Sequence, residues 1–128
     1  MRIAVILVVV FLCGSALAEA RDDCYKKDGE VAIKGCTELI WRNPKEADAY
    51  IFRGLEYYAK GEFERAIADY KKAIEINPRH ARAYNNRGMA YEALKRRDEA
   101  LADYRQALAI DSNMQHSMDG LKRLGASQ

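Results

Sequence analysis

The strongest constraint on this chain is a recurrence of residues at a constant separation of 34 positions. Thirteen residues of one segment recur with the same identity in the next. In the first segment they are Ala47, Ala49, Tyr50, Arg53, Gly54, Tyr57, Ala59, Ala66, Ala68, Asp69, Tyr70, Ala73 and Ile76. A period of this length indicates one supersecondary unit stacked on its copies, because a single unit cannot bury its own apolar face.

The apolar spacing inside each unit predicts two helices. Tyr50, Gly54 and Tyr57 lie three and four residues apart, and the apolar residues from position 63 to 74 follow the same spacing. Gly61 interrupts the pattern between the two helices. Pro78 ends the unit, because the residue before a proline is disfavoured in helical conformation. We therefore expect four antiparallel helices over residues 47–112, with the recurring tyrosines (Tyr50, Tyr57, Tyr70, Tyr84, Tyr91 and Tyr104) packed in the core.

An early tyrosine, a glycine and a second tyrosine, followed by alanines and a closing proline, resemble the tetratricopeptide repeat family. Residues 47–80 and 81–114 carry this resemblance as two repeats. It implies an all-α fold, an α-solenoid of helix-turn-helix repeats. Ser112 replaces the closing proline in the second repeat, and Arg53 and Arg87 stand where many members have leucine.

The segments on either side complete this prediction. Residues 19–46 are expected to form a degenerate half-repeat, with a short helix from about residue 20 to 27 and a second from 30 to 42. Residues 115–128 are expected to form a capping helix and tail, because terminal repeats otherwise expose an apolar face. The apolar stripe of this last helix is Met114, Met118, Leu121 and Leu124.

Residues 1–18 have the layout of a secretory signal peptide. Arg2 precedes an apolar run from position 3 to 12, which is shorter than the about 20 residues that a membrane span needs. Ala16 and Ala18 form the small-residue pattern of a cleavage site, with cleavage after Ala18 or after Ala20. The alternative is a retained membrane anchor. We expect the mature chain to be periplasmic or secreted, with no membrane contact after the signal is removed.

Two cysteines remain after this segment, and export would place them where thiols become oxidised. A turn at Asp28 and Gly29 would bring Cys24 and Cys36 onto neighbouring antiparallel helices. We predict a disulfide between them, with two buried reduced thiols as the alternative. The bridge would clamp the weakest unit of the repeat.

No arrangement of residues indicates catalysis. His80 and His116 have no cysteine or carboxylate at metal-ligand spacing, so no metal site or cofactor is predicted. Asp69 and Asp103 recur without an accompanying nucleophile and are expected to make structural contacts. Lys and Arg number 21 against 19 Asp and Glu, so no large field of one sign indicates a nucleic-acid partner.

In the family that this chain resembles, the first helices of successive repeats line a concave groove that binds peptides. Carrying this over by position predicts a partner-binding groove lined by Asp48, Ile51, Leu55, Tyr58, Arg82, Asn85, Asn86, Met89 and Glu92. Some members clamp a C-terminal carboxylate there, but Phe52 occupies a position that this clamp needs polar. The predicted function is binding a peptide segment of an envelope or periplasmic protein. The alternative is a self-associating homodimer with no separate ligand.

Overall fold

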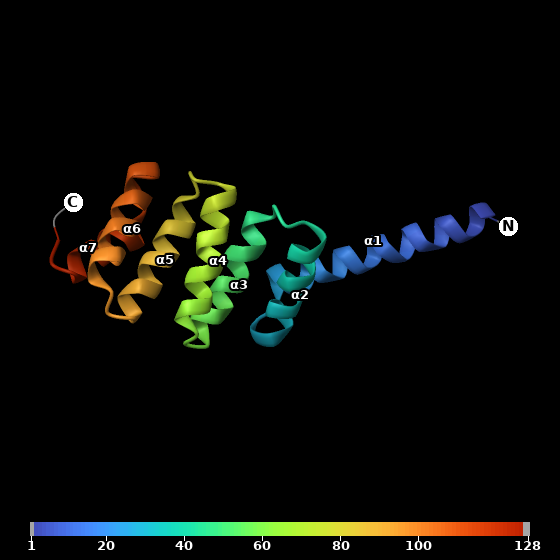
Figure 1. The fold of residues 1–128 in the computed structure, drawn as a ribbon, viewed down its shortest axis with the longest axis horizontal. Coiled ribbons are helices and arrows are strands. Elements are labelled where there is room, and N and C mark those ends of the chain that lie inside the picture. Colours follow the sequence, from blue (N-terminus) through green and yellow to red (C-terminus); the bar gives the residue numbers. More distant parts are fainter. Residues whose placement is uncertain (1, 127–128) are drawn as a thin grey trace.

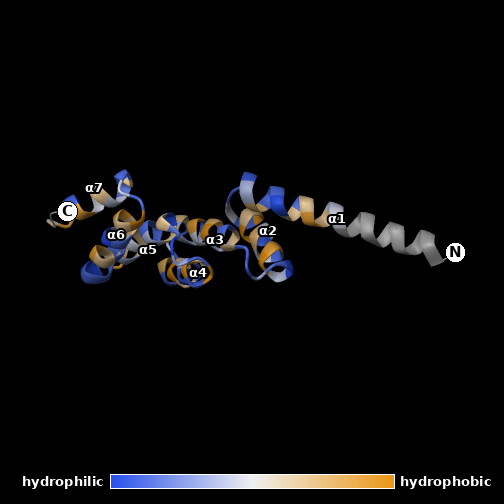
Figure 2. Cartoon of the chain, turned by 90° about the horizontal axis from the view of Figure 1, so that it is seen from above, coloured by the Kyte–Doolittle hydropathy of each residue, from blue (hydrophilic) through white to orange (hydrophobic). Residues whose placement is uncertain are grey.

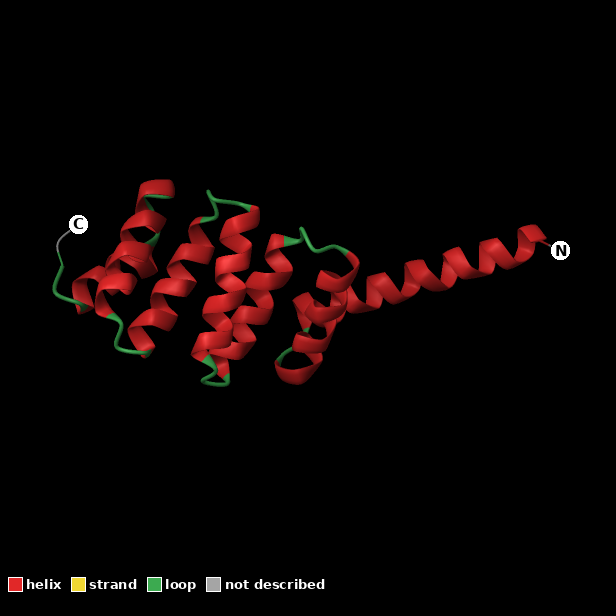
Figure 3. Ribbon diagram, viewed as in Figure 1, coloured by secondary structure: helices red, strands yellow, loops and turns green. Residues whose placement is uncertain are grey.

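The computed structural model describes the backbone of residues 2–126 and the side chains of residues 14–126. Within residues 2–126 the chain forms seven helices and no strand (Figure 3). The helices follow one another along the long axis of the molecule, with the two termini at opposite ends (Figure 1). The expected all-α solenoid is therefore confirmed.

The two full units form the four helices expected for them. They are α3 (Ala47–Ala59), α4 (Phe63–Ile76), α5 (Ala81–Ala93) and α6 (Arg97–Ile110). The turn inside the first unit has Gly61 at φ +76°, and the equivalent place in the second unit is Lys95 at φ +61°. A left-handed backbone is uncommon for a residue other than glycine, so the repeat geometry is maintained at Lys95 against its local preference.

A glycine and a tyrosine set the distance between the helices of each unit. A Cβ added to Gly54 would lie 2.6 Å from Cε1 of Tyr70, and one added to Gly88 would lie 2.9 Å from Cε1 of Tyr104. Both tyrosine side chains are fully buried. Of the other predicted core tyrosines, Tyr50 and Tyr57 are buried, whereas Tyr84 and Tyr91 are only half-buried beneath the Arg87 guanidinium.

The N-terminal pair consists of α1 (Arg2–Lys26) and α2 (Gly29–Arg42). The prediction of a short first helix was wrong in extent, because α1 begins at Arg2 rather than near Ala20. Ala, Leu and Glu between positions 16 and 20 are strong helix formers, so nothing separates the leader segment from the helix behind it. None of the helices in the described chain is long and apolar enough to cross a membrane.

The last helix, α7 (Gln115–Arg123), covers the end of the second repeat as expected. Leu121 of the predicted stripe is buried, whereas Met114, Met118 and Leu124 are half-buried. Two small residues outside that stripe make the closest contacts. Ser117 is buried, and a Cβ added to Gly120 would lie 2.6 Å from Cζ of Tyr104.

Candidate functional site

One side of the solenoid is formed by the first helix of every pair. Figure 2 shows α7 and α1 at the two ends of a curve, with α3 and α5 between them and α4 on the opposite side. We call the side formed by α1, α3, α5 and α7 the concave face. This is the side on which the sequence places the predicted groove.

The predicted groove residues differ in how accessible they are. Asp48 and Arg82 are exposed, and four others are half-buried: Leu55, Tyr58, Met89 and Glu92. Asn85 and Asn86 are buried, at 4% and 6% exposure. Ile51 has 0% exposure and packs in the apolar cluster around Tyr70, so it belongs to the core rather than to the groove surface.

The two adjacent asparagines connect α5 to the capping helix. Asn85 donates from Nδ2 to Oδ1 of Asn86 at 3.2 Å and accepts a hydrogen bond from the Ser117 hydroxyl at 2.9 Å. The Nδ2 atom of Asn86 is buried and has no hydrogen-bond partner in the described chain. A buried amide donor without a partner costs free energy, and sites of this kind are often completed by a ligand or a water.

A hollow of about 330 Å³ lies across three successive first helices. Tyr58 of α3, Met89 and Glu92 of α5, and Arg123 of α7 line it, and Lys95 follows α5 at its edge. Three of the predicted groove residues therefore come together here. Arg123 was not predicted, because the capping helix was expected to serve packing alone, and Lys95 was not predicted, because it lies in the turn between α5 and α6.

The acidic wall of this hollow is already neutralised within the chain. Glu92 accepts hydrogen bonds from Nε of Arg123 at 3.0 Å and from Nη2 at 3.1 Å, and from the Tyr104 hydroxyl at 2.5 Å. The hydrogen bond from Arg123 is the largest effect, and it holds the pKa of Glu92 below its ordinary value although burial acts in the opposite sense. Glu92 is therefore a fixed structural anion.

Two cationic side chains on the concave face form no ion pair within the described chain. Arg82 and Lys95 are exposed, and neither forms an ion pair within the described residues, although the charge of Lys95 acts on the nearby Glu92. Asp48 lies 3.1 Å from Nε2 of His80, which connects the start of α3 to the loop before α5. The predicted groove therefore carries the exposed guanidinium of Arg82 and the exposed carboxylate of Asp48.

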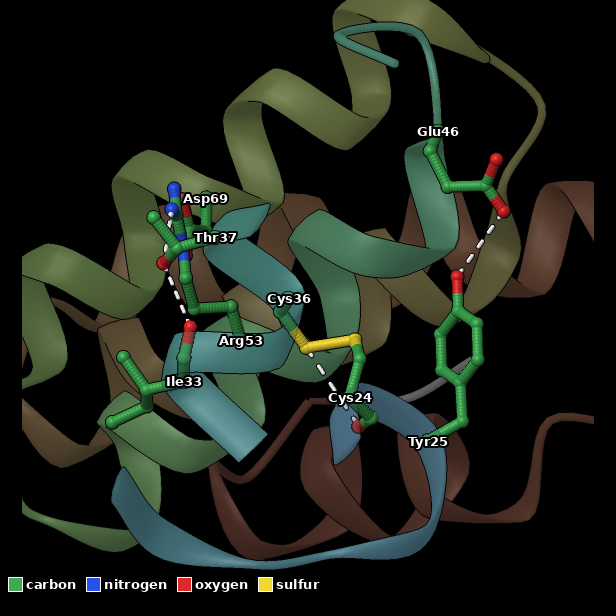
Figure 4. Close-up of a disulfide and its surroundings, with 8 residues drawn as sticks. All are labelled: Cys24, Tyr25, Ile33, Cys36, Thr37, Glu46, Arg53 and Asp69. Carbon is green, nitrogen blue, oxygen red and sulfur yellow. Dashed lines mark hydrogen bonds and ion pairs between the residues drawn. A yellow bond between two sulfur atoms is a disulfide. The ribbon is translucent and has the colours of Figure 1, made fainter. Parts of the chain in front are cut away.

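At the N-terminal edge, the predicted disulfide joins Cys24 and Cys36 with 4.5 Å between their Cα atoms (Figure 4). It joins the end of α1 to α2, and the end of α1 also contacts α3. There the ring of Tyr25 meets Phe52 edge-on at 4.9 Å, and the Tyr25 hydroxyl donates to Glu46 at 3.1 Å. Burial is the main cause that raises the pKa of Tyr25 well above its usual range. Phe52 is therefore covered by an aromatic ring, which closes the position that a carboxylate clamp would need.

Two ion pairs in the structure were not predicted from the sequence. Arg53 donates to Asp69 at 2.8 and 2.7 Å, and Arg87 donates to Asp103 at 2.7 and 2.8 Å. The Asp69 pair appears in Figure 4. The arginine and the aspartate are separated by the same stretch of chain in both units, and both recur with the repeat period. That paired recurrence was the signal that could have revealed them.

No cluster of three or more potential metal-ligating side chains occurs in the described part of the chain. The buried aspartates are occupied by arginine, and the histidines lie in inter-helix loops or on exposed helix positions.

Comparison with known proteins places this architecture in a family. The TPR repeat family matches residues 54–95, and the tetratricopeptide repeat family matches residues 81–114. No curated protein matches the sequence.

Several solved structures are similar over nearly the whole chain. The TPR domain of Arabidopsis OM64 is 29% identical with a TM-score of 0.79, over 88% of this chain and 93% of that one. A complex of the TPR2B domain of yeast Sti1 with pHsp70 is 30% identical with a TM-score of 0.69, over 88% and 89%. The first TPR of Spaghetti bound to the HSP90 peptide SRMEEVD is 23% identical with a TM-score of 0.73, over 91% and 89%.

The regular recurrence in the sequence, the stacked helix pairs and these matches agree, and the chain belongs to the tetratricopeptide repeat family.

Proposed function

We propose that this protein is an exported interaction module that binds a peptide segment of an envelope or periplasmic protein on its concave face. The proposal rests above all on the hollow shared by α3, α5 and α7. A site lined from two repeats and the capping helix exists only when the helices are stacked, so binding there is coupled to the repeat architecture rather than to a single helix.

The lining determines what kind of segment would fit. Tyr58 and Met89 offer apolar surface, and aromatic side chains often dominate the energy of binding at interfaces. Lys95 offers positive charge at the edge of the hollow, and Arg82 offers it near the start of α5, where it lines a separate hollow. The Nδ2 of Asn86 is a buried donor with no partner in the described chain. An extended peptide with one apolar side chain and a carboxylate nearby would satisfy all three features.

Related domains support a peptide ligand of this type. The peptide bound to the first TPR of Spaghetti, SRMEEVD, is acidic toward its end, and the yeast Sti1 domain was solved in complex with pHsp70. We do not propose the same clamp here, because Phe52 packs against Tyr25. The proposed ligand is recognised instead from α5 and the capping helix.

Export is the second part of the proposal. The leader layout of residues 1–18 and an oxidised Cys24–Cys36 pair both favour an oxidising compartment. Ala20 is buried against the disulfide cluster at 6% exposure. Cleavage after Ala18 would retain this contact, whereas cleavage after Ala20 would remove it, so we propose Glu19 as the first residue of the mature chain.

Binding is tested by charge reversal on the concave face. Affinity capture from the envelope fraction is compared for the wild type, for Arg82→Glu with Lys95→Glu, and for Lys45→Glu with Lys71→Glu. Both variants make the same change in charge at exposed positions, so both are expected to fold normally. The first variant is expected to lose the captured partner and the second to keep it. Equal capture by both variants would overturn the groove assignment.

Export has its own test. Mass spectrometry of the protein isolated from expressing cells is expected to show an N-terminus at Glu19 and a disulfide between Cys24 and Cys36. A chain that still begins at Met1, with both thiols free, would contradict export while leaving the binding face unaffected.

A further inference from the structure

The turns that follow α3, α5 and α7 share one backbone geometry but not one residue type. The residues directly after the C-caps of these helices are Gly61, Lys95 and Gly125, with φ of +76°, +61° and +69°. A left-handed residue at this place is commonly glycine, because a Cβ is unfavourable there. Within the described residues, Lys95 is the one residue other than glycine with a positive φ.

The side chain of Lys95 is not needed to form its turn. The amide of Lys95 donates to the carbonyl of Glu92 at 3.0 Å, and the amide of Gly61 donates to the carbonyl of Tyr58 at 2.9 Å. The two turns therefore have the same backbone hydrogen bond, with and without a side chain. A glycine at position 95 would form this turn with less backbone strain, so folding alone does not account for a lysine here.

Lys95 borders two hollows of the concave face. It lines the hollow between α3, α5 and α7, and it also lines a second hollow of about 320 Å³ with Glu92, Arg97 and Leu124. Arg97 donates to the carbonyl of Leu124 at 2.6 Å, and its Nη1 atom lies 4.0 Å from the exposed Asp98. The guanidinium of Arg97 is therefore occupied by contacts within the chain.

Positive charge exceeds negative charge in the lining of these two hollows. The charged lining residues are the cations Lys95, Arg97 and Arg123 and the carboxylate Glu92. Glu92 accepts two hydrogen bonds from Arg123. Among the three cations, only the side chain of Lys95 forms no hydrogen bond or ion pair within the described chain. A ligand carboxylate would therefore meet a favourable field and an exposed, unpaired ammonium.

Apolar surface lies beside this ammonium. Tyr58 and Met89 are half-buried and line the same hollow of about 330 Å³ as Lys95. An extended peptide advances about 3.3 Å per residue. A peptide that seats a large apolar side chain between Tyr58 and Met89 therefore brings the residues next to it within reach of Lys95.

We infer that Lys95 sets the specificity of the proposed binding site: its ammonium binds the side-chain carboxylate of a ligand aspartate or glutamate close to the apolar residue held by Tyr58 and Met89. This inference rests on the proposed function. Residues in an unfavourable backbone conformation cluster at ligand sites, where the contact that they make requires their side chain. The contact differs from a clamp on a terminal carboxylate, because it recognises a side chain within the peptide.

The first test measures stability by exchanging the residues of two equivalent turns. Lys95→Gly is expected to raise the Tm by about 3 °C, because the left-handed backbone is relieved. Gly61→Lys is expected to lower the Tm by a similar amount, because nothing lies within 4 Å of an added Cβ and the backbone conformation alone is unfavourable. A Tm of Lys95→Gly at or below that of the wild type would show that the lysine serves folding, and would overturn the inference.

The second test measures specificity with a random library. Phage that display random heptapeptides, fused through their C-termini so that no terminal carboxylate is free, are selected on the wild type, Lys95→Gly and Lys95→Glu. The wild type is expected to enrich peptides with an acidic residue close to a large apolar one. Lys95→Gly should keep the apolar preference and lose the acidic enrichment at least about tenfold, and Lys95→Glu should select lysine or arginine instead.

The matched control is Lys71→Glu, which reverses an exposed charge on α4, on the opposite side of the solenoid (Figure 2). It should select the same peptides as the wild type. Acidic enrichment that survives in Lys95→Gly, that disappears equally in Lys71→Glu, or that is absent among apolar peptides selected by the wild type would overturn this inference and leave peptide binding intact. A wild type that selects no peptide would overturn the proposed function as well.

Discussion

At the scale of residues, the most informative positions are the arginines that replace leucine in the repeat. Arg53 and Arg87 each form two hydrogen bonds to a buried aspartate on the neighbouring helix of the same unit. The side chain of Asp103 is only 6% exposed, and that of Arg87 is 19% exposed. Because each charge is removed from water, the pair is held by its mutual geometry rather than by surface attraction.

The pair therefore predicts a strongly non-additive result. Arg87→Leu leaves Asp103 buried without a counter-charge and is expected to lower the free energy of unfolding by about 3 kcal/mol. The double variant Arg87→Leu with Asp103→Leu removes both charges and is expected to cost less than the single one. Urea unfolding of the wild type, the two single variants and the double variant measures this coupling. Additive losses would show that the pair contributes nothing specific.

The Glu92 carboxylate predicts an acid-dependent loosening of the capping helix. Its pKa is lowered, chiefly by Arg123, so its contribution to stability is complete above the ordinary glutamate value of about 4.3 and is lost as the pH falls below it. The wild type should therefore be more stable than Glu92→Gln near neutral pH, and this difference should disappear toward pH 3. Thermal unfolding from pH 3 to 7 measures it.

The matched control for that titration is Glu75→Gln on α4, where the glutamate pairs only with the half-exposed side chain of Lys72. This control should track the wild type at every pH, within the small contribution of a surface pair. If Glu92→Gln and Glu75→Gln behave alike, Arg123 does not hold the capping helix through Glu92.

At the scale of helices, the N-terminal pair depends on its covalent link. Gly35 of α2 lies directly against α1, where an added Cβ would be 2.6 Å from the backbone nitrogen of Cys24. Cleavage after Ala18 would leave only residues 19–26 of α1, a segment that is too short to be stable as a helix in isolation. The disulfide and this close packing therefore hold the first helix in place.

Replacing both cysteines with serine is expected to cost about 3 kcal/mol, because the bridge closes a loop of twelve residues. This loss of stability should be confined to the N-terminal helix pair. Hydrogen exchange is expected to show that residues 19–26 lose protection while α3 to α6 keep theirs. Uniform loss along the whole chain would mean that the N-terminal pair is an integral part of the core, and unchanged protection of residues 19–26 would mean that the disulfide is dispensable.

Much of this architecture could be predicted from the sequence, because the signals were periodic. The glycine–tyrosine contacts recur with the repeat period, so the helix pairs and most core tyrosines were predictable. Contacts that occur only once in the chain could not be predicted in this way. Ser117 with Asn85 and Arg123 with Glu92 belong to the capping helix, which lies outside the repeat, and polar residues on a terminal helix give no periodic signal. Ile51 was misplaced because its position in the repeat indicated the groove while its actual neighbours bury it.

At the scale of the whole molecule, stacking converts a repeated sequence into two long and chemically different sides. The first helices contribute exposed residues at equivalent positions of successive units: Asp48, Arg82 and His116. The second helices contribute Thr37, Lys71 and Arg105, which are likewise exposed and equally spaced. If the concave face is the binding surface, a partner touches the first set and not the second.

Photo-cross-linking in living cells distinguishes these two sides. A benzoylphenylalanine residue is placed at each of the six positions in turn, and cross-linked products larger than the chain are identified by mass spectrometry. We predict one common partner from Asp48, Arg82 and His116 and none of it from Thr37, Lys71 and Arg105. Cross-linking to that partner from the second helices, at a yield equal to or above that from the first, would contradict binding on the concave face.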